Sequence, residues 1–214
     1  MKILPLTVLA LGVALPGLAS ADVAGDPQKG KEATAVCVAC HQADGTGLNN
    51  AGAEAWPQLA GLNADYIVKQ LADYKSGQRV NASMTAFAQM LSEQQMVDVA
   101  AYYSQLPPGA GQGGESADEA TLARGKTLAE RGDWSNYVVS CQSCHGPGNQ
   151  GAGSVFPGIA GQHAGYIEAQ LKAWQADTRT NDPQDLMGSV ARRMTDSDIR
   201  AVAAWLSTQP ARSN

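Results

Sequence analysis

The five-residue segment CVACH at positions 37–41 returns as CQSCH at positions 141–145. Both copies fit the pattern C-x-x-C-H, which is an attachment site for a covalent c-type haem. Two thiols three positions apart on one helical turn can both reach one edge of a porphyrin, and the adjacent histidine can then face the iron. The two copies use all four cysteines and two of the three histidines of the chain. We therefore predict two haem c groups, attached at Cys37, Cys40, Cys141 and Cys144 and ligated by His41 and His145.

Two other interpretations of four cysteines are weaker. Two disulfides are possible in an exported chain, and a C-x-x-C pair can also be a redox motif, but neither requires a histidine after the second cysteine in both copies. A structural zinc site needs four ligands, whereas two cysteines and one histidine supply three. Haem is therefore the preferred interpretation.

The first 21 residues have the pattern of a signal peptide. Lys2 precedes an apolar run from Ile3 to Leu18, and Ala19-Ser20-Ala21 follows as a small-residue cleavage site. The run is interrupted by prolines and is short for a membrane span, so an uncleaved anchor is the less favoured alternative. We expect cleavage after Ala21 and export to the periplasm.

The charge balance excludes some partners. The full chain has 15 basic and 20 acidic residues, a formal net charge of −5, and loss of Lys2 with the signal peptide makes it −6. A negative chain is a poor ligand for nucleic acid. Residues 22–107 contain five basic and nine acidic residues, whereas residues 119–214 contain nine of each. The first half is therefore the acidic half.

The mature chain is an internal duplication. The segment AWPQLAGLNADYIVKQLADYKSGQR at 55–79 matches VFPGIAGQHAGYIEAQLKAWQADTR at 155–179 with a constant offset of 100 residues. Beyond residue 79 the offset becomes 103, because TNDPQD lengthens the second copy. Residues 108–118 are rich in Pro, Gly and Ser and have no apolar periodicity, which predicts a linker. We therefore expect domains at 22–107 and 119–214.

Each unit is predicted to contain three principal helices. The first carries the C-x-x-C-H motif and is expected from Asp26 to Cys40, and from Glu119 onward with a break at Gly132. The middle helix has apolar side chains at helical spacing over 65–77, with its counterpart at 164–175. The last helix begins at the capping-box pattern Ser92-x-x-Gln95, and at the weaker Thr195-x-x-Asp198 in the second unit. No segment has a convincing strand pattern, so the fold class is all-α.

The repeat selects the second axial ligand of each iron. At offset 103, Met84 coincides with Met187, whereas the positions that match the other methionines hold other residues. We expect Met84 and Met187 to lie in loops before the last helices, and Met90, Met96 and Met194 to be ordinary core residues. A thioether opposite histidine raises the potential of a haem and closes its iron to substrates. This predicts electron transfer rather than catalysis.

Other residues are candidates for contacts around the haems. The carbonyl groups of Pro57 and Pro157 are candidate acceptors for the imidazole Nδ1 protons, although an ordinary loop proline explains them equally well. Four further side chains are candidate partners of the haem propionates: Tyr66, Tyr166, Arg79 and Arg179. Their alternative role is as ordinary residues of helix surfaces or of the core. His163 is a rival iron ligand, but its position at a helix start favours a capping or surface role.

Two C-x-x-C-H units, each followed by PQLAG or PGIAG, a Y-I-x-x-Q-L helix and a later methionine, resemble the two-haem cytochromes of the cytochrome c4 family. The resemblance spans essentially the whole mature chain. It implies two tandem class I cytochrome c domains, each a small helical bundle around one haem, related by approximate twofold symmetry. It also implies that His41 with Met84, and His145 with Met187, ligate the irons. The segments ERGDWSNYVVS (130–140), with Trp134 and Tyr137, and TNDPQD (180–185) could serve a particular partner.

Three functions follow as hypotheses. The first is a periplasmic two-haem carrier that passes single electrons between respiratory donors, such as a membrane cytochrome complex, and a terminal oxidase. The second is a dedicated electron-accepting subunit of a periplasmic dehydrogenase that oxidises thiosulfate, sulfide or an alcohol. The third, a two-haem peroxidase, would need an iron site that opens. In each case we expect redox protein partners, and membrane contact only through them.

Overall fold

The computed structural model describes residues 24–50 and 52–212, and the predicted signal peptide at 1–21 lies outside the described residues. The first half of this part folds into helices joined by short turns. In chain order its helices are α1 Pro27–Ala33, the 3₁₀ helix η1 Thr34–Val36, α2 Val38–His41, α3 Ala64–Ser76, α4 Ala82–Met90 and α5 Glu93–Gln105.

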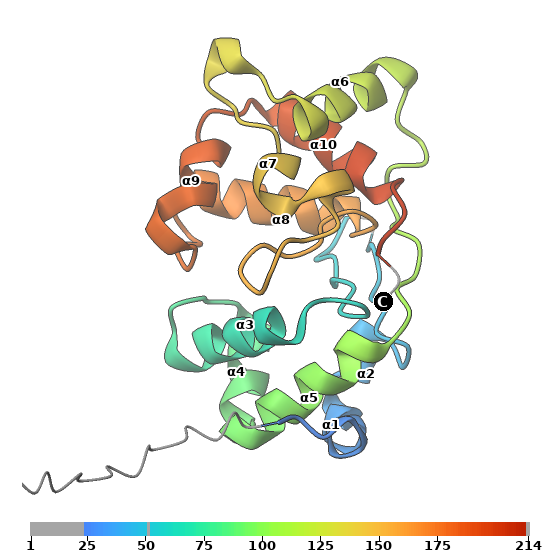
Figure 1. The fold of residues 1–214 in the computed structure, drawn as a ribbon, viewed down its shortest axis with the longest axis vertical. Helices are drawn as coiled ribbons and strands as arrows, with labels where there is room; N and C mark the ends of the chain where they lie inside the picture. Colours follow the sequence, from blue (N-terminus) through green and yellow to red (C-terminus); the bar gives the residue numbers. More distant parts are fainter. Residues whose placement is uncertain (1–23, 51, 213–214) are drawn as a thin grey trace, which may run out of the picture.

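The second half repeats this arrangement with additional short turns. Its helices are α6 Glu119–Glu130, η2 Trp134–Asn136, α7 Gln142–His145, η3 Pro147–Asn149, α8 Ala164–Gln175, η4 Pro183–Asp185, α9 Leu186–Ala191 and α10 Asp196–Ser207. The described residues form three isolated antiparallel bridges and no sheet, which confirms the all-α prediction. The two units lie end to end, with α3 and α8 on their facing sides (Figure 1).

The segment before each C-x-x-C-H motif is broken rather than continuous. The prediction of one helix from Asp26 to Cys40 is wrong, because α1 ends at Ala33 and the chain tightens into a 3₁₀ turn. At this point the Thr34 hydroxyl donates to the Lys31 carbonyl oxygen at 2.7 Å. In the second unit the break does occur at Gly132, whose φ of +76° is accessible to glycine at little cost. Each motif is therefore carried by a separate short helix, α2 or α7.

The boundaries of the longer helices follow from local chemistry. The Asn63 side chain accepts a hydrogen bond from the Tyr66 amide at the start of α3, as N-cap residues do. Ser92 with Gln95, and Thr195 with Asp198, form complete capping boxes at the starts of α5 and α10. The patterns in the sequence located these starts.

The segments that carry Met84 and Met187 are helical, in α4 and α9, so the expectation of loops is wrong. In the first unit Asn81 supplies the cap, because its side chain accepts hydrogen bonds from the amides of Ser83 and Met84. The residues that follow, ASMTAFAQM, contain no Gly or Pro. Neither the cap nor the helix-forming composition was used in the sequence prediction.

Each unit has its own apolar core. Helices α1 and α5 cross in the first unit, and α6 and α10 cross in the second. The first core is formed by Ile67, Leu71, Tyr74, Ala88, Leu91, Met96, Val99, Ala100 and Tyr103. The second includes Leu128, Ile167, Leu171, Met194, Ile199, Val202, Trp205 and Leu206. Met90, by contrast, is 68% exposed, so its assignment to a core is wrong.

Residues 108–118 have no helix, and they pack against both units. The Gly109 amide donates to the Gln58 side chain at 2.6 Å, and the Gln112 carbonyl accepts from the Ala164 amide at 2.9 Å. The Gln112 side chain also accepts from the Asn49 amide at 3.1 Å. This connection is therefore part of the boundary between the units.

Candidate haem and iron sites

Both motif histidines end a short helix, and each is held from the same side. His41 Nδ1 lies 2.8 Å from the carbonyl oxygen of Pro57, and His145 Nδ1 lies 2.7 Å from that of Pro157. The prolines thus occupy the positions expected from the spacing. A hydrogen bond at Nδ1 orients the imidazole and leaves Nε2 available to bind a metal.

The surroundings of both imidazoles favour the neutral form, which is the form that binds a metal. Each side chain is buried, His41 with 6% and His145 with 7% of its surface exposed. Burial lowers the pKa of both imidazoles below the ordinary value of histidine, and the proline carbonyls offset this only in part. With the proton on Nδ1, each ring keeps its Nε2 lone pair.

The cysteines of each motif are half-buried thiols. Burial raises the pKa of the Cys37 thiol and raises that of Cys141 to about 11. Cysteines that act as nucleophiles or redox centres have a lowered pKa, since the thiolate is the reactive form. These environments therefore do not favour a redox or nucleophilic role for Cys37 and Cys141.

A cavity of about 470 Å³ with mostly apolar walls adjoins both motifs and continues across the boundary between the units. Its volume is within the range of small-molecule and cofactor sites. The predicted site residues that line it are Cys37, Cys40, His41, Pro57, Tyr66, Arg79 and Met84 from the first unit. From the second unit they are Cys141, Cys144, His145, Pro157, Tyr166, Arg179 and Met187.

The five methionines among the described residues differ in their position relative to the cavity. Met84 and Met187 line it from α4 and α9, and Met194 also reaches its wall. Met194 matches Leu91 in the repeat, and Leu91 lines the wall of the first unit, so this position is apolar in both units. Met84 and Met187 are therefore the one pair of matched positions at which both units place a methionine on the cavity wall among the described residues.

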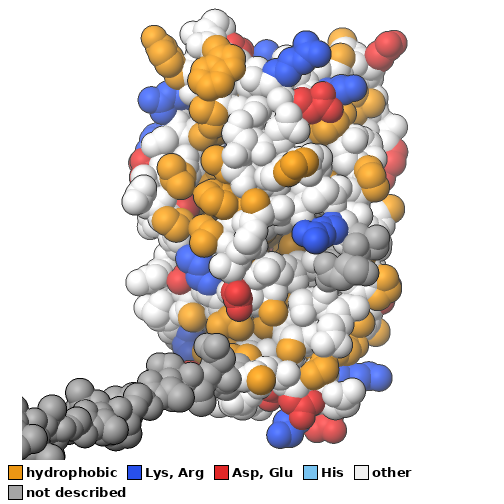
Figure 2. All heavy atoms as spheres, viewed as in Figure 1, with side chains coloured by type: hydrophobic (Ala, Val, Ile, Leu, Met, Phe, Trp, Pro, Cys, Tyr) orange, Lys and Arg blue, Asp and Glu red, His pale blue; other side chains and the backbone are white. Residues whose placement is uncertain are grey.

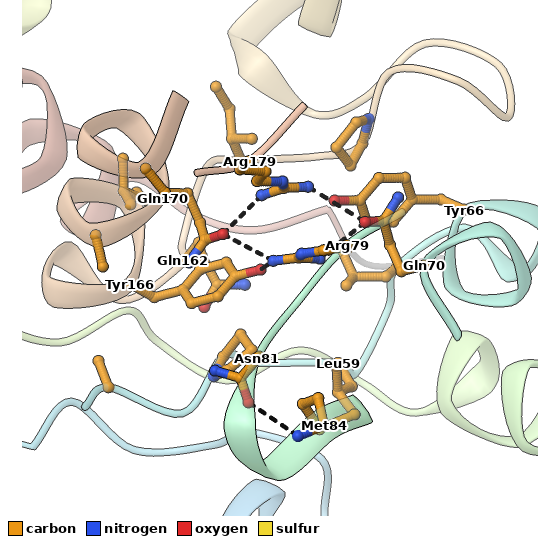
Figure 3. A pocket seen from close by; sticks show the side chains of 18 of the residues that line it. Leu59, Tyr66, Gln70, Arg79, Asn81, Met84, Gln162, Tyr166, Gln170 and Arg179 are labelled. Atoms are coloured by element: carbon orange, nitrogen blue, oxygen red, sulfur yellow. Dashed lines mark hydrogen bonds between the residues drawn. The ribbon is translucent and has the colours of Figure 1, made fainter. Parts of the chain in front are cut away.

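Two arginines meet at the boundary between the units (Figure 3). The Arg79 guanidinium donates to Gln70, to Gln170 and to the Tyr166 hydroxyl at 2.7–3.0 Å. Arg179 donates to the same two glutamine side chains at 2.8 and 3.2 Å. The two glutamines occupy matched positions of the repeat. Their identity in both units was visible in the sequence, but the sequence prediction did not assign them the role of binding the arginines.

These arginines are buried charges without a carboxylate partner of their own. Arg79 is 5% and Arg179 is 7% exposed, and within residues 24–50 and 52–212 their side-chain hydrogen-bond partners are amide and hydroxyl oxygens. Buried cations are normally paired with anions. Trp174 Nε1, on the same cavity wall, is a buried donor with no acceptor among the described residues. Two cations and a free donor on an apolar cavity fit the carboxylates of haem, so the residues present fit the group at both sites.

His163 was expected to cap a helix or lie on the surface, and both expectations are wrong. It occupies the N-cap position of α8, but its side chain makes no capping hydrogen bond and is fully buried. Its Nε2 lies 2.8 Å from the Thr46 carbonyl oxygen, and its Nδ1 accepts from the Gln112 amide at 3.2 Å. It therefore joins the second unit to the first and to the connecting segment.

The insertion before the second motif (130–140) forms a loop, of which Val139 and Ser140, next to the motif, line the cavity and residues 130–138 do not. Trp134 and Tyr137 are 68% and 76% exposed. Their segment, drawn in yellow in Figure 1, lies at the end of the molecule away from the first unit, and hydrophobic side chains project at that end in Figure 2. Asp133 holds the loop, because it accepts hydrogen bonds from Ser135, Asn136 and Arg124. These bonds hold the pKa of Asp133 far below its ordinary value.

Residues 24–50 and 52–212 contain no cluster of three or more His, Cys, Asp or Glu side chains that could hold a metal ion. None of the helices in these ranges has the length and apolarity needed to span a bilayer.

Comparison with known proteins places these observations in a family. The family model described as Cytochrome c matches residues 27–107 and 122–210. The thiosulfate dehydrogenase electron acceptor of Thiomonas intermedia is 47% identical over 82% of this chain and 79% of its own length. Cytochrome c4 of Thiocapsa roseopersicina is 40% identical over 88% of this chain and 95% of its own.

Solved structures agree. Reduced cytochrome c4 from Pseudomonas stutzeri superimposes with a TM-score of 0.79 at 33% identity, over 87% of this chain and all of that one. Thiosulfate dehydrogenase from Marichromatium purpuratum gives 0.78 at 36% identity, over 86% of this chain and 40% of that one. The two C-x-x-C-H motifs accordingly bind two covalent haem c groups. The chain belongs to the cytochrome c family and, within it, to the two-haem cytochromes of the cytochrome c4 group.

Proposed function

We propose that this protein carries single electrons between redox proteins of the periplasm and that neither haem is a catalytic site. One observation carries the proposal. In each unit a neutral, oriented histidine and a methionine from a different segment line the same cavity as a C-x-x-C pair. When bound, the haem iron supplies one-electron redox chemistry.

The axial ligands in this proposal are His41 with Met84 and His145 with Met187. Histidine and methionine together complete the coordination of a haem iron and raise its reduction potential. An iron with both axial positions filled has no position for oxygen, peroxide or another substrate. This ligand set therefore supports a carrier and opposes a peroxidase.

Arg79 and Arg179 are proposed to neutralise the haem propionates, with Tyr166 as a further donor. The support is their burial and the absence of a carboxylate among their hydrogen-bond partners in the described part of the chain. Tyr66 lines the same cavity from α3 and, like Tyr166, is half-buried, so it is proposed as a second tyrosine donor. Export to the periplasm through a signal peptide at residues 1–21 completes the proposal.

The ligand assignment is tested by replacing one methionine at a time in the holoprotein. Met84→Ala should abolish the thioether-to-iron charge-transfer band of one haem and lower the potential of that haem, because a soft ligand that favours reduced iron is lost. Met187→Ala should do the same at the other haem. Met90→Ala is the matched control, since Met90 is exposed and should change neither band. An equal response of both haems to one substitution, or no response, would show that the assignment is wrong.

A second function is favoured by a specific observation. Two relatives that are 47% and 45% identical, from Thiomonas intermedia and Stutzerimonas stutzeri, are thiosulfate dehydrogenase electron acceptors. The chain also matches part of a solved thiosulfate dehydrogenase. We propose, as a special case of the carrier, that this protein accepts electrons from a thiosulfate-oxidising dehydrogenase.

Stopped-flow reduction distinguishes the two donors. The oxidised protein is mixed with a thiosulfate dehydrogenase and thiosulfate, or with a quinol-oxidising cytochrome complex and quinol. Fast, saturable reduction by the dehydrogenase that slows with added salt would support the special case, because exposed charges that steer association are screened by salt. Reduction by the cytochrome complex alone would leave the general carrier and remove the special case.

A further inference from the structure

An asparagine that is present at matched positions of the two units makes different contacts in each unit. The offset changes from 100 to 103 residues between Arg79 and Met84, and within this stretch Val80-Asn81 still matches Thr180-Asn181 at the offset of 100. Met84 and Met187 match at the offset of 103, so three extra residues stand between Asn181 and Met187. A residue three positions from the methionine in the first unit is thus six positions from it in the second.

In the first unit Asn81 places the segment that carries Met84. Its Oδ1 accepts hydrogen bonds from the Ser83 amide at 3.0 Å and from the Met84 amide at 2.8 Å, and the second of these is drawn in Figure 3. The cap therefore acts directly on the backbone of the methionine. It is a neutral amide.

In the second unit Asp182 takes over this contact. Its Oδ2 accepts from the Met187 amide at 2.7 Å and from the Gly188 amide at 3.4 Å. The contact to the methionine backbone is thus preserved across the insertion, although the residue that makes it now carries a carboxylate. Asn181 is released from capping.

The released Asn181 reaches the first unit. Its Nδ2 donates to Gln70 Oε1 at 3.1 Å and to the Asp73 carboxylate, and its carbonyl oxygen accepts from Lys69 at 2.8 Å. Lys69 and Asp73 are also paired with each other on α3. Their matched positions in α8 are Ala169 and Ala173. Only the first unit therefore has a lysine–aspartate pair at these positions that can bind an asparagine of the other unit.

The inserted residues are held in an unusual conformation. Gln184 and Asp185 have φ values of +57° and +56°, in a region that residues other than glycine seldom adopt. The Asp185 carboxylate pairs with Arg192 at the end of α9. The loop is therefore anchored at both ends of α9 and, through Asn181, to the other unit.

We propose that residues 181 and 182 form a positioning link: Asp182 places Met187, and Asn181 ties that segment to α3 of the first unit. Methionine ligation in the second unit then depends on Lys69 and Asp73 of the first, whereas ligation by Met84 has no such dependence. The carboxylate of Asp182 also lowers the potential of the second haem relative to a neutral cap, since negative charge favours oxidised iron. The inference rests on the proposed role of Met187 as an iron ligand.

The test uses the holoprotein with Met84→Ala as background, so that the charge-transfer band reports on the second iron alone. Imidazole is titrated until it displaces the methionine and bleaches the band. Asp182→Ala should lower the half-bleaching concentration roughly fivefold, the effect of a typical lost cap. Asp73→Ala and Asn181→Ala should each lower it at least twofold, and the effect of the double variant should be smaller than the two effects combined, because both single variants remove the hydrogen bond between Asn181 and Asp73.

Two comparisons control the result. Asp73→Ala in the Met187→Ala background should leave the band of the first iron unchanged, whereas Asn81→Ala should weaken that band as Asp182→Ala weakens the other. Asp182→Asn keeps an acceptor oxygen, so it should leave bleaching within twofold of the parent while the potential of the second haem rises.

Three results would overturn the proposal. One is equal weakening of both bands by Asp73→Ala, which would indicate general destabilisation of the fold. Another is a second band that is insensitive to Asp182→Ala. A third is the absence of any band in the Met84→Ala background, which would reject Met187 as a ligand and so remove the basis of the link. This outcome differs from failure of the link alone, in which the band is present and can be titrated.

Discussion

Asn63 and His163 stand at the same position of the duplicated middle helix, yet only Asn63 caps it. Asn63 accepts a hydrogen bond from an amide of its own helix, whereas His163 is buried between the units. Asn81 and Asn181 differ in the same direction. In both pairs the residue of the first unit makes a hydrogen bond within its own helix segment. The matched residue of the second unit instead makes hydrogen bonds across the boundary between the units. The duplicated helices are thus similar, but the boundary between them is built asymmetrically.

The largest effect should come from a feature that the two units share. A Cβ atom at Gly30 would lie 2.0 Å from the Asp98 carbonyl oxygen, and one at Gly125 would lie 2.1 Å from that of Ala201. At these points α1 touches α5 and α6 touches α10, backbone against backbone. Gly30→Ala and Gly125→Ala should each lower the free energy of unfolding by about 3 kcal/mol, the upper range of overpacking. Denaturant unfolding of each holoprotein variant measures this cost.

The control for this pair is Gly77→Ala, at a position with open space around it and a φ of +81°. Strain in the left-handed region alone should cost about 1 kcal/mol there. If substitution of either Gly30 or Gly125 lowered the free energy of unfolding by no more than substitution of Gly77, the close helix crossing would not be a feature that both units share.

The sequence predicted well what depends on neighbouring residues. The spacing of C-x-x-C-H indicated haem, the offset of the repeat paired Met84 with Met187, and Ser92 located the start of a helix. Each of these depends on residues within a few positions or on the comparison of one unit with the other. Such signals do not require knowledge of which surfaces meet.

The boundary between the units was predicted poorly for the complementary reason. His163 was expected to cap a helix or lie on the surface because it stands at a helix start, and the contacts of residues 108–118 with both units were not predicted. A repeat offset shows which positions correspond, but it does not show which side of a helix faces the other unit. Gln70 and Gln170 illustrate this, because their identity in both units was visible while their contact with Arg79 was not.

An intermediate effect, with a pH dependence, is expected at His163. Replacing it with asparagine removes two buried hydrogen bonds to Thr46 and Gln112, which should cost about 2 kcal/mol near neutral pH. Burial lowers the pKa of His163, against smaller opposing effects of the Thr46 carbonyl and Glu115. The folded state therefore favours the neutral ring, and this stability is present above the unfolded pKa of about 6.5 and is lost as the pH falls below it.

Unfolding free energies of the holoprotein and of His163→Asn, measured above pH 7 and near pH 5, should converge at the lower pH. Asn63→Ala is the matched control, since it removes a cap worth about 1 kcal/mol but no titrating group near neutrality. A difference between wild type and His163→Asn that stays constant with pH would contradict the tautomer assigned here, in which Nδ1 is an acceptor.

The smallest effect should distinguish the two capping boxes. Ser92→Ala and Thr195→Ala should each cost about 1 kcal/mol, because each removes an acceptor for a helix amide. The boxes differ at their third helical residue, which is the amide Gln95 in one and the carboxylate Asp198 in the other. Burial raises the pKa of Asp198, but hydrogen bonds from Arg124 and Thr195 outweigh it and hold the pKa below its ordinary value.

A carboxylate with a lowered pKa stabilises the folded state above its unfolded pKa of about 3.9, and this contribution is lost as the pH falls below that value. The start of α10 should therefore weaken in acid while the start of α5 does not. Hydrogen exchange of the first amides of both helices, compared near pH 6 and near pH 3, measures the difference. Asp198→Asn should make α10 behave like α5, whereas equal acid weakening of both helices would mean that the carboxylate in the second box has no effect of its own.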